Sequence, residues 1–202
     1  MPHRQSVWLL LVILALLGPL TVGCQNSHEY HGNPVGGPLP LPDFELRATD
    51  GQPFRLSDVE GDIALIYFGY TFCPDVCPLT LTDVRKALAG LDGREQVHFI
   101  FISVDPERDT PEVLERYVTA FDPSFIGLSD DFAKVEVVMP DYGAFAEKET
   151  TSASAAGYLM NHTARVYLVG PQRELLLTYP FGFAPDALRS DLEHLLATAV
   201  KN

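Results

Sequence analysis

Short apolar runs alternate with amphipathic segments along most of the chain. Residues 63–68 form a continuous apolar run, which is typical of a central strand covered on both faces. Residues 97–104 and 125–128 predict two further strands. Between these runs the pattern predicts a helix over residues 78–91 and a second helix from Thr110 onward. The order strand, helix, strand, helix, strand indicates an α/β domain with a sheet at its centre.

The second of these helices has a clear start, since the sequence Asp109-Thr110-Pro111-Glu112 contains a cap residue and a proline in the first turn. Its expected apolar stripe is Val113, Tyr117 and Phe121. The other predicted elements are a small hairpin around Asp50-Gly51 (residues 44–47 and 53–56), a short helix (131–139), a loop (148–157), an antiparallel hairpin (165–169 and 174–179) and a C-terminal helix (186–200) with Leu188, Leu192, Leu195, Leu196 and Ala199 inward.

The N-terminus does not fit the domain pattern. His3 and Arg4 precede an apolar run over residues 7–17, and Leu-Thr-Val-Gly leads into Cys24. This arrangement is typical of a secretory signal over residues 1–23, and it resembles a bacterial lipoprotein signal in which Cys24 is lipidated. The alternatives are a plain signal peptide that leaves Cys24 free, or an uncleaved anchor. All of them place the protein outside the cytoplasm, in the cell envelope, and lipidation predicts a membrane anchor.

Residues 24–42 are polar and rich in Gly and Pro, so they predict a flexible tether, and the domain is expected over residues 43–202. His28 and His31 lie in this tether, where mobile surface histidines are expected rather than a metal site. The net charge of −13 argues against nucleic acid as a partner, because a chain this acidic repels phosphates.

Two cysteines carry the candidate chemistry. Cys73 and Cys77 are one helical turn apart, at the point where the strand of residues 63–68 turns into a helix. Helix N-terminal amides stabilise thiolates there, so the pair can bind a soft metal or form a disulfide that takes part in redox exchange. A purely structural disulfide is the weaker interpretation, because so short a loop gains little entropic stabilisation.

Cu(I) is satisfied by two thiolates and one imidazole, so one further histidine would complete a copper site. His162 is the candidate, because it immediately precedes a predicted core strand. Spacing alone leaves open whether it is a ligand or a solvent-exposed loop residue. His98 lies within a strand and His194 lies on the terminal helix, which makes both less suitable.

Two acidic residues near these motifs have two interpretations each. Asp105 either tunes the site electrostatically or bonds the backbone of its own turn. Asp75 either caps the helix that contains Cys77 or faces a partner.

Three motifs together resemble the SCO/SenC family of copper-binding, thioredoxin-like proteins that help to assemble the dinuclear copper centre of cytochrome c oxidase. They are Gly69-Tyr-Thr-Phe-Cys-Pro-Asp-Val-Cys-Pro78, Ser103-Val-Asp-Pro-Glu-Arg-Asp-Thr-Pro111 and His162-Thr163 before a strand. The resemblance covers residues 41–200. It implies a thioredoxin-like sandwich with a central mixed sheet and an N-terminal hairpin, and copper ligation by Cys73, Cys77 and His162. The family commonly has Asp before this histidine, whereas this chain has Asn161.

The resemblance implies a membrane-tethered copper metallochaperone. Its partner would be the oxidase subunit that carries the dinuclear centre, and its cargo would be Cu(I), with Cu(II) as a second candidate. The alternative is a thiol–disulfide oxidoreductase in which Cys73 and Cys77 keep the oxidase cysteines reduced. His162 separates the two hypotheses, because disulfide exchange needs only the cysteines.

Overall fold

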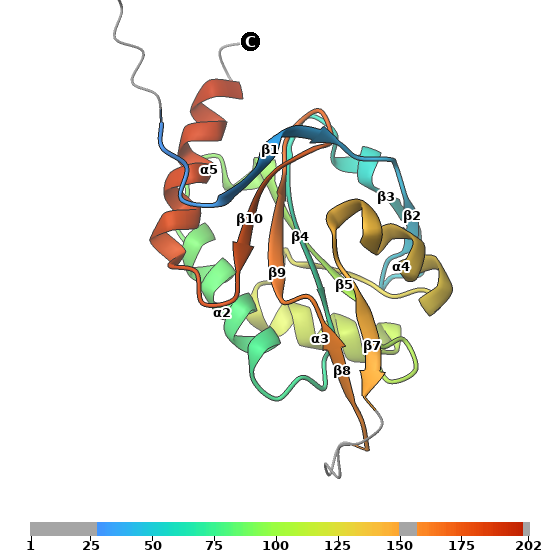
Figure 1. The fold of residues 1–202 in the computed structure, drawn as a ribbon. Coiled ribbons are helices and arrows are strands. Elements are labelled where there is room, and N and C mark those ends of the chain that lie inside the picture. Colours follow the sequence, from blue (N-terminus) through green and yellow to red (C-terminus); the bar gives the residue numbers. More distant parts are fainter. Residues whose placement is uncertain (1–27, 150–156, 200–202) are drawn as a thin grey trace, which may run out of the picture.

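A six-stranded mixed sheet forms the centre of the protein (Figure 1), and the computed structural model describes residues 28–149 and 157–199. The strands are β1 (Asn33–Pro40), β2 (Glu45–Arg47), β3 (Pro53–Arg55), β4 (Ile63–Gly69), β5 (Val97–Ser103), β6 (Ile126–Leu128), β7 (Ala146–Glu149), β8 (Leu159–His162), β9 (Arg165–Val169) and β10 (Glu174–Pro180). The helices are α2 (Val76–Leu88), α3 (Pro111–Phe121), α4 (Phe132–Val138) and α5 (Pro185–Ala199), with short 3-10 turns η1 (Leu56–Val59), η2 (Arg94–Gln96) and η3 (Met139–Tyr142).

The strand order in the sheet is β1-β10-β9-β4-β5-β6. The β4, β5 and β6 strands are parallel to one another, whereas β9 is antiparallel to β4, and β10 and β1 continue the antiparallel half. All seven residues of β4 are buried, as its continuous apolar run predicts. Two separate hairpins, β2-β3 and β7-β8, flank this sheet.

Neighbouring residues of β4 reach opposite faces of the sheet. The Tyr67 ring lies 5.8 Å from that of Phe101, whose ring in turn packs on Tyr117 of α3. The Phe68 ring lies 5.5 Å from that of Tyr142 in η3. The sheet is therefore covered on both faces, by α3 on one and by η3 on the other. The α2 helix contacts both α3 and α5. The carboxyl end of β4 leads through a loop to the start of α2.

The segment expected to be a flexible tether is in part a strand. Residues Asn33–Pro40 form the edge strand β1, in which Asn33 pairs with Thr178 and Pro40 with Glu174. Prolines are tolerated there because an edge strand leaves one side of its backbone unpaired, and the register shift between Pro34 and Leu39 accommodates the glycines. The ordered domain therefore includes residues before position 43, which the Gly- and Pro-rich composition concealed.

Several boundaries also differ from the sequence-based prediction. The α2 helix begins at Val76 rather than at residue 78, and the predicted helix 131–139 continues past Pro140 as η3. The deepest positions of α3 are Leu114 and Val118, whereas the predicted stripe is only half-buried. The β7-β8 hairpin occupies both sides of the segment predicted to be a loop, so His162 is the last residue of a strand. The hairpins 44–56 and 165–179 and helix α5 are confirmed.

The predicted signal peptide over residues 1–23 and Cys24 lie outside the described residues. Across residues 28–149 and 157–199, none of the helices has the length and apolarity needed to cross a membrane.

Candidate metal centre

The loop that carries Cys73 starts at a glycine that packing requires. A Cβ added to Gly69 would lie 2.6 Å from the Tyr67 ring and 2.8 Å from the Phe101 ring, so a larger residue would displace the end of β4. The loop then turns, with the Cys73 amide donating to the carbonyl of Tyr70 at 3.4 Å. Backbone packing at the end of the central strand thus sets the direction in which Cys73 leaves the sheet.

The sulfur of Cys73 caps helix α2. The Cys77 amide donates to Cys73 Sγ at 3.4 Å, and within the described residues the side chain of Asp75 makes no capping hydrogen bond although Asp75 holds the N-cap position. The proposed capping role of the Asp75 side chain is therefore wrong. A sulfur in this position faces the positive end of the helix, which favours a thiolate.

His162 comes from a segment far from the two cysteines in the sequence. It ends β8, where it pairs with Ala146 of β7, and the next residue, Thr163, donates its amide to the Phe145 carbonyl at 3.1 Å. The hairpin places Nε2 of His162 3.6 Å from Sγ of Cys77. The donor atoms of Cys73, Cys77 and His162 all lie within 4.8 Å of one another.

Two tyrosines hold the imidazole ring. The rings of Tyr67 and Tyr70 meet that of His162 edge-on, with centroids 6.1 Å and 5.7 Å away. Tyr67 also donates its hydroxyl to Cys77 Sγ at 3.5 Å. The Nδ1 atom of His162 is buried and has no hydrogen-bond partner among the described residues. The ring is thus oriented by aromatic packing, with Nε2 turned toward the sulfurs.

The two thiols differ in protonation. A hydrogen bond from the Cys77 thiol, aided by His162, lowers the pKa of Cys73 to about 3 even though burial opposes the charge. The same hydrogen bond, together with burial, raises the pKa of Cys77. Cys73 is consequently the half-exposed thiolate and Cys77 the buried thiol at neutral pH. Cys77 becomes a thiolate as well when a cation replaces the proton that the two sulfurs share.

The two segments that carry the candidate ligands border one depression in the surface. One side consists of the Cys73 loop and the start of α2, with Tyr70, Cys73, Pro74, Asp75 and Val76. The other side consists of His162 and its neighbours Met160, Asn161 and Ala164. The site is therefore reachable from solvent along this depression, on the side of Cys73 rather than of the buried Cys77.

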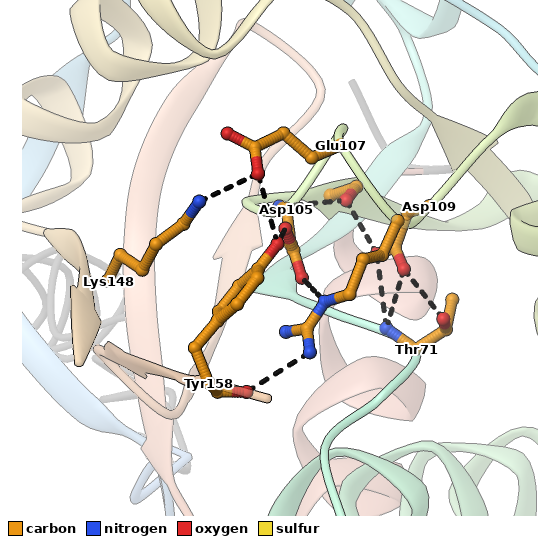
Figure 2. A network of polar contacts seen from close by, with 8 residues as sticks. Thr71, Asp105, Glu107, Asp109, Lys148 and Tyr158 are labelled. Carbon is orange, nitrogen blue, oxygen red and sulfur yellow. Dashed lines mark hydrogen bonds and ion pairs between the residues drawn. The ribbon is translucent and has the colours of Figure 1, made fainter. Parts of the chain in front are cut away.

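Asp105 belongs to a polar network beside the site (Figure 2). Its buried carboxylate accepts from Nε of Arg108 at 2.5 Å and from the hydroxyl of Tyr158 at 2.6 Å. Arg108 in turn donates to the Tyr158 carbonyl, and its guanidinium carbon lies 3.6 Å from the centroid of that ring. Lys148 of β7 bonds Glu107 at 2.7 Å. The network holds the start of β8, the strand that ends in His162, against the turn after β5.

The remaining histidines of the described residues lie away from this centre. His28 Nε2 is 2.9 Å from Asp191, and its ring stacks on His194 at 4.2 Å. The backbone amide of His31 also donates to Asp191, at 3.0 Å. The expectation that His28 and His31 are mobile is thus wrong, because a buried carboxylate of α5 holds this segment. His98 is bound to Asp62 at 2.8 Å.

Comparison with known proteins identifies the family. The SCO1/SenC family model matches residues 36–197. The chain belongs to the SCO1/SenC family. Among curated SCO relatives, mitochondrial SCO2 of Saccharomyces cerevisiae is 32% identical over 152 residues, which are 74% of this chain and 49% of the yeast protein. The chain thus spans about half the length of that relative.

Solved SCO structures agree with the fold. Apo Sco1 of Thermus thermophilus is 39% identical, with a TM-score of 0.71 over 86% of this chain and 99% of that chain. ScoI of Bradyrhizobium japonicum, solved with copper bound, is 35% identical, with a TM-score of 0.68 over 77% of this chain and 99% of that chain. The family membership and the thioredoxin-like fold with a central mixed sheet are both confirmed.

The sequence analysis did not identify the two tyrosines that pack against the imidazole of His162. Tyr67 and Tyr70 were counted as strand and motif residues, because nothing in the spacing shows that a ring faces His162. For the polar network, the sequence offered one signal: three charged residues, Asp105, Arg108 and Asp109, follow directly after a buried strand. Charged side chains at the end of a buried strand often belong to a functional site.

Proposed function

We propose that this protein is a copper metallochaperone that binds Cu(I) through Cys73, Cys77 and His162. Proteins of its family take part in copper delivery to cytochrome c oxidase, and the recipient proposed here is the oxidase subunit that carries the dinuclear copper centre. The observation that carries the proposal is the placement of two sulfurs and one imidazole nitrogen within 4.8 Å of one another. Two thiolates and one imidazole are a donor set that suits Cu(I).

The arrangement supports transfer by ligand exchange. Cys73 is half-exposed at the depression, whereas Cys77 is buried beneath it. An incoming thiolate or imidazole of the recipient can approach from the Cys73 side, bind the ion, and displace Cys73 before Cys77. Copper then moves between donor sets without being released into solution.

A thiol–disulfide oxidoreductase is the second candidate, and the unequal thiols favour it. The low pKa of Cys73 beside a buried, protonated Cys77 matches the division into an attacking and a resolving cysteine. In that role Cys73 attacks a disulfide of the partner, a mixed disulfide forms, and Cys77 then releases the reduced partner as Cys73–Cys77 becomes oxidised. In this chemistry His162 only helps to lower the pKa of Cys73, whereas copper binding would need it as a ligand.

We further propose that residues 1–23 are a signal peptide and that lipid on Cys24 anchors the protein on the outer side of the cytoplasmic membrane, in the bacterial envelope. The apolar run before Cys24 supports export. Mass spectrometry of the mature N-terminus tests this directly: a diacylated Cys24 is expected, and an unmodified Cys24 would contradict the anchor.

The experiment that separates the two functions uses a strain that depends on this protein, grown at limiting copper. Full-length chains carrying His162→Ala or the matched control His98→Ala are compared for oxidase activity and copper content. A chaperone predicts loss of activity with His162→Ala alone. Normal oxidase activity with His162→Ala would favour the oxidoreductase.

A further inference from the structure

Asp109 is a buried carboxylate that belongs to none of the roles described above. It follows β5 in the turn that leads into α3, its residue is 0% exposed, and it points at the loop that carries Cys73 (Figure 2). Burying a carboxylate is costly unless hydrogen bonds satisfy it, so the identity of its partners indicates what the residue does.

The partners of this carboxylate lie mainly in the Cys73 loop. One carboxylate oxygen accepts the hydroxyl of Thr71 at 2.6 Å, and the Thr71 amide lies 3.2 Å and 3.1 Å from the two oxygens. The second oxygen also accepts the hydroxyl of Ser103, the last residue of β5, at 2.6 Å. Asp109 therefore connects the rigid end of a central strand to a residue two positions before Cys73.

The backbone of Asp109 is itself fixed. Its amide donates to the Asp105 carbonyl at 2.9 Å, and its carbonyl accepts the hydroxyl of Ser129 at 2.9 Å. The loop, by contrast, lies outside regular structure from Tyr70 to Asp75. Asp109 is thus fixed by residues next to the sheet, and its carboxylate in turn fixes the Cys73 loop through Thr71.

We propose that Asp109 is a positioning residue for the metal centre: by fixing Thr71 it holds Cys73 within reach of Cys77 and His162. This rests on the proposed function where copper is concerned, but the same restraint also governs how readily Cys73 meets Cys77 in the metal-free protein. Without it, Cys73 samples positions farther from both partners, and the local concentration of its sulfur at Cys77 falls.

The test uses five forms of the protein that lack residues 1–24: wild type, Asp109→Asn, Thr71→Val, Thr71→Ser and Asp191→Asn. Thr71→Val removes the hydroxyl, whereas Thr71→Ser retains it. Asp191→Asn is the matched control, because Asp191 is an equally buried carboxylate with hydrogen bonds to Tyr179 and Gly32, in a different part of the fold. Each form is measured for thermal stability, Cu(I) affinity by competition, and the Cys73–Cys77 disulfide equilibrium against glutathione.

Asp109→Asn and Thr71→Val are expected to lower Cu(I) affinity by about 10-fold or more, the usual effect of removing a group that orients a ligand. The disulfide equilibrium constant is expected to fall by about 10-fold, which raises the reduction potential by about 30 mV. Thr71→Ser and Asp191→Asn should retain wild-type values of both quantities, even where Asp191→Asn lowers the melting temperature as much as Asp109→Asn does.

Two results would overturn the proposal. One is wild-type affinity and disulfide equilibrium in Asp109→Asn and Thr71→Val. The other is a loss that follows thermal stability in all variants, with Asp191→Asn affected like Asp109→Asn. Failure of the wild type to bind Cu(I) would remove the proposed function alone, because the disulfide equilibrium measures the position of Cys73 without metal.

Discussion

Sγ of Cys77 lies 3.6 Å from Nε2 of His162, although 85 positions separate the two residues. One belongs to the first turn of α2 and the other ends β8, so tertiary packing alone brings them together. The buried sulfur is thus adjacent to the imidazole, while the half-exposed sulfur of Cys73 completes the group.

His162→Ala should reduce Cu(I) affinity by about 100-fold or more, since removing even an orienting group around a metal ligand costs 10- to 100-fold. Competition with a chromogenic Cu(I) chelator measures the affinity. His98→Ala is the control, because His98 binds Asp62 instead. Equal affinities for the two variants would show that His162 is not a ligand.

Alkylation should distinguish the two thiols in the metal-free, reduced protein. Because the pKa of Cys73 is lowered to about 3 and that of Cys77 is raised, iodoacetamide at pH 5 should label Cys73 and leave Cys77 unmodified. Peptide mass spectrometry gives the two rates. Cys77→Val should raise the pKa of Cys73, since the Cys77 thiol is the main donor to it. Similar labelling of both cysteines at pH 5 would contradict this assignment.

Copper and the disulfide should exclude each other. A Cys73–Cys77 bond requires the sulfurs to approach to about 2.05 Å, and neither sulfur then remains a thiolate for the metal. Bound Cu(I) should therefore protect both thiols from alkylation and from oxidation by a disulfide reagent. Labelling at the same rate with and without one equivalent of Cu(I) would show that the sulfurs do not hold the ion.

Asn161 has a structural partner that explains why an amide fits this position. Its Nδ2 donates to Glu147 of β7 at 3.0 Å. Asn161→Asp would place two carboxylates against each other and should destabilise the β7-β8 hairpin by about 0.5–1 kcal/mol, the scale of a cross-strand pair. Chemical denaturation measures the change, and Asn161→Asp combined with Glu147→Gln should restore stability. Equal stability of Asn161→Asp and wild type would show that the pair contributes nothing.

Acid should weaken the contact between the N-terminal segment and α5. Burial alone would raise the pKa of Asp191, but hydrogen bonds from Tyr179, Gly32 and His28 outweigh it and hold the pKa below its ordinary value of 3.8. A lowered carboxyl pKa stabilises the fold above pH 3.8, and this stabilisation is lost as the pH falls through the folded-state value.

Asp191→Asn should accordingly lower the free energy of unfolding at pH 7 by about 1–3 kcal/mol and flatten its dependence on pH below 4. Urea denaturation at pH 3 to 7 measures both effects. An unchanged slope in the variant would assign the acid sensitivity to other carboxylates.

Apolar periodicity predicted most of the fold. The run over residues 63–68 identified β4, and the hairpins and α5 followed from turn residues and helical spacing. The pattern failed where local composition and tertiary context disagree: β1 contains three prolines and two glycines and exists because β10 offers it a free edge. The exposed β7 has no apolar alternation to reveal it.

The candidate metal centre also has residues that local sequence predicts and residues that only the tertiary fold explains. Cys73 and Cys77 were identifiable because their spacing is local, and His162 needed the family resemblance because its partners are distant in sequence. Of the two interpretations of Asp75, the helix cap is wrong, because the sulfur of Cys73 accepts the amide of Cys77 instead. The contribution of Asp109 depends on the path of a loop, which no spacing rule describes.

The attachment of residues 28–32 to α5 fixes where the N-terminal segment leaves the domain. Gly32 bonds Asp191 and His28 stacks on His194, so toward its N-terminus the chain runs along α5 away from Pro185. The α5 helix starts after β10 at the end of the sheet where Cys73 lies, and its 15 residues span about 22 Å. If the proposed lipid is present on Cys24, it would hold the domain by the end opposite Cys73, Cys77 and His162, so that these three side chains would face away from the bilayer.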